Sequence, residues 1–303
     1  DTAAGVPVLT GMGDIKHSLI SMAQVHNGYW YFITNNSGKK GLAVLSVDEK
    51  IRNIETVFTH TLPEAAASKY LTYCGSFAAF SDASNRFVSV IDGSLLLFSQ
   101  TGSTVQYLDT FTIDDDAFSG VSFVGESVYA AAGSSLYRFS TADDALVLEG
   151  TTETGLNLAA CYAPTPELLY TFYSEEERLY MSLFHKEEQP ETGADMVRVS
   201  VPYLIIPAAL RNPSLSGPKY SFHRTGTRLL IDNGLHLVDL DIATPSAPAV
   251  SAVHNYISSQ GSLNVPSHFN PIQPDVKYVI SRIVPDSLLS DGSQYISLTR
   301  IEF

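Results

Sequence analysis

Basic residues are scarce in this chain. Lysine and arginine together number 18 against 32 aspartates and glutamates, which leaves a formal net charge of -14. A protein that binds nucleic acid needs a basic face for the phosphates. Docking onto anionic lipid also needs positive charge on the protein. The composition therefore argues against a nucleic-acid partner and against an anionic membrane surface.

Long apolar runs and cysteines are also missing. The longest apolar candidate, YLIIPAAL at residues 203–210, contains Pro207, and it is shorter than the roughly 18–20 residues of a membrane helix. We therefore expect no insertion into a membrane. The only cysteines are Cys74 and Cys161, which excludes a disulfide scaffold. Two buried thiols are the favoured interpretation, and a single bridge is the alternative.

The sequence lacks the common catalytic patterns. It contains no Gly-x-Ser-x-Gly, phosphate loop or dinucleotide fingerprint, and its 8 histidines form no His-Glu-x-x-His motif. The acidic run at residues 114–116 lacks the spacing of a calcium loop, and we interpret it as a solvated turn. Residues 175–178 read as a charged hairpin tip. No metal or cofactor is predicted, although calcium at the acidic run is left open.

Apolar and aromatic residues are abundant. Hydrophobic residues make up 45% of the chain, with 16 Tyr and 15 Phe, whereas only 17% of residues are charged. This profile favours strands over exposed helices, in a chain long enough to bury a large core. The first residue is Asp1 rather than Met, and the composition is acidic. We therefore expect a mature protein that is secreted, periplasmic or on the cell surface.

One hairpin stands out in the text LLIDNGLHLVDLDIATPSAPAV at residues 229–250. Asp-Asn-Gly between two alternating apolar runs is a strong hairpin signal, because the turn needs positive φ angles. Further alternating segments precede and follow this hairpin. The pattern predicts four consecutive antiparallel strands at residues 219–225, 228–232, 235–241 and 249–256.

The same order of four strands recurs along the chain. The predicted units cover residues 18–61, 72–113, 120–153, 158–202, 219–256 and 267–303. The last unit has one strand too few, and residues 5–13 supply a spare strand at the other end of the chain. Pairing that strand with residues 295–301 would close a ring and remove its exposed edges.

A repeated four-stranded unit of this length is typical of a β-propeller. We predict a single all-β domain with six four-stranded blades, closed by the N-terminal strand. Seven blades are the alternative if residues 202–218 conceal one, and a pair of β-sandwiches is the alternative fold. The connections at residues 185–193 and 284–293 are predicted to be excursions from the ring.

The text LHLVDLDIATPSAPAV at residues 235–250 resembles the blade repeat of surface-associated propellers, in which Leu-x-Val-x-Asp is followed by two spaced prolines. Residues 135–148 resemble it without the prolines. The resemblance covers one blade well and implies a propeller fold. The chain has no WD dipeptides at blade ends and no kelch double-glycine pattern.

Propellers bind ligands at one end of the central channel, on the loops that join successive blades and on the turns between second and third strands. The first set of loops is predicted to carry a binding surface made of His17, Tyr73, Phe118, Asn157, Arg211 and His268. Phe118 has an alternative role as a packing residue between blades. The catalytic residues, if any, are unknown from the sequence.

The favoured interpretation is a non-catalytic scaffold that presents these loops to a protein or glycan partner. The alternative is a propeller hydrolase or lyase with a metal at the channel mouth. A fold does not by itself decide between them.

Overall fold

The computed structural model describes residues 8–17, 20–36, 39–47, 54–62, 78–81, 83–114, 116–187, 196–208, 221–225, 227–232, 236–255, 268–269, 276–282 and 294–302. The fold is nearly all β, as predicted, and its strands form antiparallel sheets, most of them four-stranded. Within the described ranges, no helix has the length and apolar character that crossing a membrane would need.

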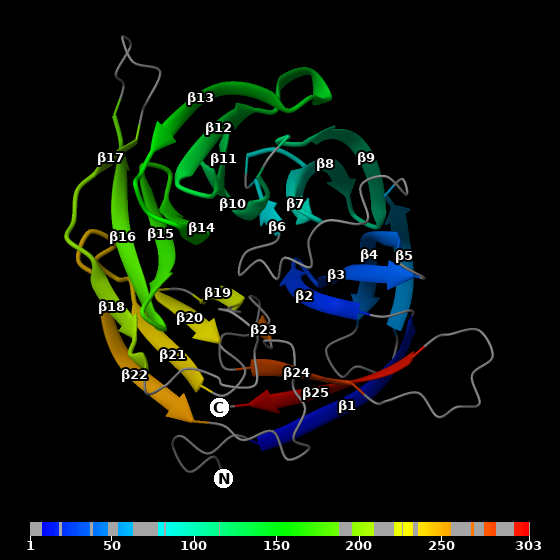
Figure 1. The fold of residues 1–303 in the computed structure, drawn as a ribbon. Helices are drawn as coiled ribbons and strands as arrows, with labels where there is room; N and C mark the ends of the chain where they lie inside the picture. Colours follow the sequence, from blue (N-terminus) through cyan, green and yellow to red (C-terminus); the bar gives the residue numbers. More distant parts are fainter. Residues whose placement is uncertain are drawn as a thin grey trace.

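The described strands form six sheets, which lie around a common centre (Figure 1). Sheet I contains β2 (Ile20–His26), β3 (Tyr29–Asn36), β4 (Lys39–Val47) and β5 (Ile54–Thr61). Sheet II contains β6 (Ala78–Phe80), β7 (Arg86–Ile91), β8 (Ser94–Thr101) and β9 (Thr104–Phe111). Sheet III contains β10 (Phe118–Val124), β11 (Ser127–Ala132), β12 (Ser135–Ser140) and β13 (Val147–Glu153).

The other three sheets come from the second half of the chain and its N-terminal strand. Sheet IV contains β14 (Leu158–Thr165), β15 (Leu168–Glu175), β16 (Arg178–Lys186), β17 (Met196–Arg198) and β18 (Tyr203–Ile206). Sheet V contains β19 (Ser221–Thr225), β20 (Arg228–Asp232), β21 (His236–Asp241) and β22 (Ala249–Asn255). Sheet VI contains β23 (His268–Phe269), β24 (Val276–Arg282), β25 (Gln294–Glu302) and β1 (Val8–His17).

The outermost strand of four sheets carries the same irregularity. The register of strands three and four shifts by one residue at Val44/Leu45, Leu97/Phe98, Arg138/Phe139 and Asp239/Leu240. In the sequence, a leucine precedes each shift by two residues. A bulge of this kind bends an edge strand and increases its twist, which hinders pairing with another chain. Sheets I, II, III and V therefore share a local geometry as well as a strand order.

Sheet IV differs from the prediction. One strand was expected to end this unit at residue 202, but two short strands pair with β16 in succession. β17 pairs with residues 184–186 and β18 with residues 179–181. Residues 203–206, in the connection suspected of hiding a blade, therefore complete the outer edge of sheet IV. Residues 209–218 of that connection lie outside the described residues.

The first and last long strands of the chain lie side by side. β1 runs antiparallel to β25, with Val8 opposite Glu302 and His17 opposite Gln294 (Figure 1). The expected spare strand covered residues 5–13, whereas β1 continues to His17. The predicted excursion at 284–293 and most of that at 185–193 lie outside the described residues.

Apolar clusters fill the space between neighbouring sheets. One cluster joins sheets I, II and III, a second joins sheets III and IV, and a third joins sheets IV and V. The innermost strands of sheets III and IV approach so closely that a Cβ on Gly120 would lie 2.8 Å from the Cα of Ala160. Cys161 is a free, buried thiol in this region, and Cys74 lies outside the described residues.

Candidate functional site

At one end of the assembly, a connection leads from the outermost strand of one sheet to the innermost strand of the next. We call this end the joining face. Two equivalent hydrogen bonds define it. The amide of Phe118, at the start of β10, donates to the carbonyl of Gly93 at 3.0 Å. The amide of Leu158, at the start of β14, donates to the carbonyl of Gly133 at 2.7 Å. Each bond ties a connection to the second turn of the preceding sheet.

Sheets I and II are joined by a buried ion pair near the same face. Lys40, at the start of β4, pairs with Asp92 in the turn between β7 and β8. The side chains are 8% and 0% exposed. A buried ion pair loses its solvation, so removing one partner leaves a costly unpaired charge. The sequence does not reveal this pair, because 52 residues separate its members and no local pattern links one to the other.

The acidic connection before β10 lies against the turn between β11 and β12. Asp114 and Asp116 are exposed, and Asp116 accepts a hydrogen bond from the amide of Ala117 at 2.8 Å. Its other carboxylate oxygen lies against Gly133, where an added Cβ would be 2.4 Å away. Asp115 lies outside the described residues. In the part of the chain that the structure describes, no three His, Cys, Asp or Glu side chains gather to hold a metal ion.

The structure places two of the six predicted binding residues with their side chains. Phe118 is 0% exposed, and its ring meets Tyr137 edge-on at 5.7 Å. Its burial matches the packing alternative and leaves no surface for a partner to contact. Asn157 is exposed on the connection between β13 and β14, where a partner can reach it.

The other four predicted residues are placed in part or not at all. His17 ends β1, opposite the first residue of β25. His268 pairs with Tyr278, near the start of β24, whereas Arg282 ends β24. The register thus puts the two histidines toward opposite ends of sheet VI. Tyr73 and Arg211 lie outside the described residues, as do the side chains of His17 and His268.

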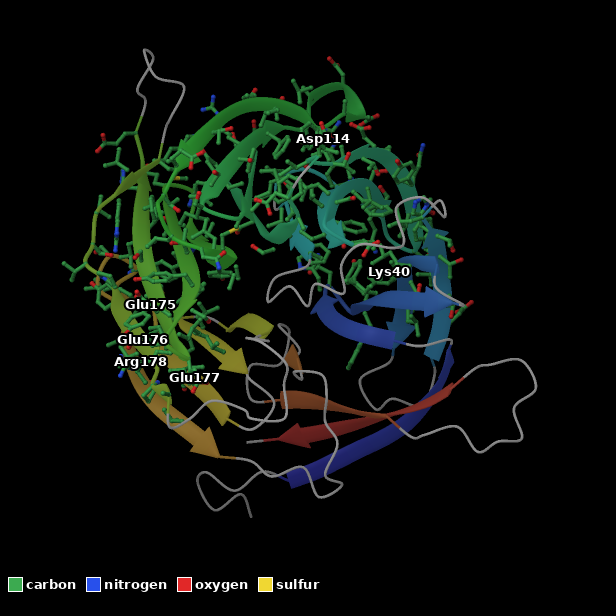
Figure 2. All side chains as sticks on the ribbon, in the orientation of Figure 1. Lys40, Asp114, Glu175, Glu176, Glu177 and Arg178 are labelled. Atoms are coloured by element: carbon green, nitrogen blue, oxygen red, sulfur yellow. The ribbon has the colours of Figure 1, made fainter. Side chains whose placement is uncertain are left out.

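The turn between β15 and β16 is an exposed part of the joining face. Figure 2 shows Glu175, Glu176, Glu177 and Arg178 together at this end of sheet IV. Arg178 forms an ion pair with Glu176 at 3.1 Å. A hydrogen bond to Tyr180 and the carboxylate of Glu176 raise the pKa of Arg178. The expected charged hairpin tip is therefore present, together with an aromatic neighbour that the sequence did not single out.

At the opposite end of the sheets, Arg86 joins sheets II and III. Its guanidinium donates to the carbonyl of Thr141 and to the carboxylate of Asp144, the latter at 2.7 Å. The rim at residues 186–192 is the alternative binding surface that the sequence suggests. Lys186 ends β16, and residues 188–192 lie outside the described residues.

Known proteins resemble this chain in fold. No family model matches the chain, and no curated protein matches its sequence. Among solved structures, a protein from Lactobacillus plantarum has a TM-score of 0.55 at 12% identity, over 92% of this chain and 83% of that one. A candidate 6-phosphogluconolactonase from Bacteroides uniformis has a TM-score of 0.52 at 11% identity, over 84% and 78% of the two chains.

A third solved structure, that of U3-55K, has a TM-score of 0.52 at 13% identity and covers 99% of both chains. These neighbours have all-β folds of the lactonase-like or propeller type. At such low identity the likeness concerns the fold alone. The chain therefore shares a fold of several antiparallel β-sheets with proteins whose names differ widely.

Proposed function

We propose that this chain is a single six-bladed propeller whose ring is closed by β1, and that it presents its joining face to a protein or glycan partner without catalysing a reaction. The pairing of β1 with β25 supports the closure, since it adds a fourth strand to sheet VI. The bulge shared by four sheets supports their equivalence as blades.

One observation carries the binding proposal: the connections on the joining face are tied to the sheets beneath them. Two equivalent hydrogen bonds, from Phe118 to Gly93 and from Leu158 to Gly133, hold two connections in place. The ion pair of Lys40 and Asp92 ties sheet I to the turn between β7 and β8 of sheet II. A surface that is rigid before binding loses little conformational entropy when a partner arrives. The exposed side chains of Asn157 and Glu176 lie on this surface.

The experiment compares two ends of the molecule. A glycan array and a phage-displayed peptide library are screened with the intact chain and with two matched double variants. Asn157→Ala/Glu176→Ala changes the joining face, whereas Glu126→Ala/Glu167→Ala removes exposed side chains at the other ends of sheets III and IV. We expect only the first variant to lose binding. Equal binding by both variants would contradict the proposal.

A second function has one observation in its favour. A solved structure with the same kind of fold is named as a candidate 6-phosphogluconolactonase, so a hydrolase or lyase with calcium or another metal at the channel mouth is the competing proposal. Hydrolysis of 6-phosphogluconolactone and of p-nitrophenyl esters, measured with calcium and then with EDTA, separates the two. Turnover that EDTA abolishes would favour the enzyme.

We also propose that the protein works outside the cytoplasm, as a secreted, periplasmic or surface protein. The acidic composition, in which only 17% of residues are charged, supports this location. Cell fractionation with an antibody against the chain tests it, and recovery in the cytoplasmic fraction would contradict it.

A further inference from the structure

A row of side chains crosses sheet IV at its joining-face end. Tyr173 on β15 lies opposite Tyr180 on β16, and Tyr180 lies opposite Leu204 on β18. Residues directly opposite in antiparallel strands point to the same side of a sheet. Exposure increases along the row: Tyr173 is 6% exposed, Tyr180 is half-buried and Leu204 is 49% exposed.

The buried tyrosine holds the partly exposed one in place. The rings of Tyr173 and Tyr180 stack with centroids 5.5 Å apart and an interplanar angle of 20°. Tyr180 therefore has little freedom to rotate, and a ligand that stacks on it would pay little entropy to order it.

Polar groups flank this ring on the same side of the sheet. Glu175 lies opposite Arg178 in the pairing of β15 with β16, and each stands two residues from a tyrosine of the row. Side chains two residues apart in a strand share a face. The guanidinium of Arg178 supplies donors, and the carboxylate of Glu175 supplies acceptors. An aromatic ring thus stands beside a hydrogen-bond donor and a hydrogen-bond acceptor.

The charge of this site limits what it can bind. Glu175, Glu176 and Glu177 are exposed around one arginine, Arg178 (Figure 2). Three carboxylates against one guanidinium leave a negative potential, which repels sulfated or carboxylated ligands. A neutral ligand with hydroxyl groups carries no net charge, so this negative potential does not repel it.

We propose that Tyr180, Arg178 and Glu175 form a binding site for a neutral oligosaccharide, an inference that rests on the proposed binding function and narrows it to one class of ligand. One face of a pyranose ring presents C–H groups, which pack on the negative face of an aromatic ring. Its hydroxyls act as donors and acceptors at once, and neighbouring hydroxyls match the adjacent Arg178 and Glu175. Leu204 extends the apolar floor for a second sugar unit.

The test uses the intact chain and a panel of defined sugars. Cellopentaose, chitotriose and mannotriose are the neutral probes, and a heparin hexasaccharide is the anionic probe. We expect one neutral probe to bind with a dissociation constant near or below about 1 mM in titration calorimetry. Tyr180→Ala should weaken that binding by about tenfold or more. Tyr180→Phe keeps the ring and should weaken it by only a few-fold.

Tyr107→Ala is the matched control, because Tyr107 is 37% exposed on the outermost strand of another sheet. It should leave binding unchanged, and circular dichroism checks that every variant folds. Failure of all three neutral sugars, tighter binding of heparin, or equal losses in Tyr180→Phe and Tyr180→Ala would overturn the inference. If joining-face variants abolish binding of a selected peptide while no neutral sugar binds, the proposed function stands and this inference falls.

Discussion

Two adjacent glutamates, Glu176 and Glu177, adopt left-handed backbone with φ angles of 48° and 64° between β15 and β16. The corresponding turn of sheet II has Asp92 and Gly93 at 54° and 78°, the residue types that favour such a turn. A side chain with a Cβ is strained in this region by roughly 1–2 kcal/mol. Sheet IV therefore keeps a turn that its own residues disfavour.

Replacing Glu177 with glycine should relieve this strain. We expect Glu177→Gly to raise the free energy of unfolding by about 1 kcal/mol, measured by urea denaturation. Glu175→Gly is the matched control, because Glu175 ends a strand and glycine weakens strands. A Glu177→Gly protein that is no more stable than the Glu175→Gly protein would show that the turn is not strained.

The buried pair of Lys40 and Asp92 allows a second prediction for single residues. Lys40→Met should lower the free energy of unfolding by about 3–5 kcal/mol, because Asp92 would remain buried without its partner charge. The double variant Lys40→Met/Asp92→Asn removes both charges, and asparagine tolerates the left-handed backbone at position 92. It should therefore recover part of the lost free energy of unfolding. Urea unfolding of the two variants measures the difference. Equal stability would mean that solvent reaches Asp92 once Lys40 is gone.

Between elements, the outermost strands of sheets I and II meet through aromatic rings. His60 on β5 stacks on Tyr107 of β9 at 4.4 Å and meets Phe98 edge-on at 5.9 Å. Burial lowers the pKa of His60 in the folded protein. The unfolded chain therefore takes up a proton at higher pH than the folded protein does.

This difference predicts a loss of stability in acid. A neutral His60 makes its full contribution to stability above the pKa it has in the unfolded chain, which is about 6.5. That contribution is lost as the pH falls from there toward the lower pKa that His60 has in the folded protein. The melting temperature should therefore decrease between about pH 7 and pH 5. His60→Phe keeps a ring in the seam and should show a smaller decrease over that range. Identical pH profiles for the two proteins would contradict this account.

At the scale of the whole molecule, the pairing of β1 with β25 matters most. Removing residues 1–13 would delete most of β1 and expose the edge of β25. We expect the melting temperature to fall by roughly 10 °C or more, since several kilocalories of pairing and packing would be lost. Removing residues 1–7 is the matched control, because it leaves intact all of the described pairing, which includes Val8 with Glu302. Unchanged melting of the longer deletion would count against closure of the ring.

Sequence reasoning was most successful for the strands. Signals such as the Asp92–Gly93 turn act over a few residues, and apolar alternation marks a strand from its own side chains. The all-β class, the antiparallel hairpins and the grouping into four-stranded units could therefore be predicted. The split into β17 and β18 could not, because both strands are defined by pairing with β16 rather than by their own pattern.

The candidate site was predicted less well. Topology indicated which connections share the joining face. Asn157 is exposed there, and its part in binding stays a prediction. It could not show that Phe118 is buried against Tyr137, because both packing and binding favour an aromatic residue at that position. Tyr180 was missed since its importance depends on the ring of Tyr173 stacked beside it.

The sequence by itself determined the class of structure: turn residues and alternation are local, so each hairpin is specified by the few residues that form it. Only the tertiary structure decided which side chains meet across sheets, including Lys40 with Asp92 and Arg86 with Asp144. These contacts depend on how one twisted sheet is placed against the next. That placement results from packing of whole faces, and no short stretch of residues encodes it.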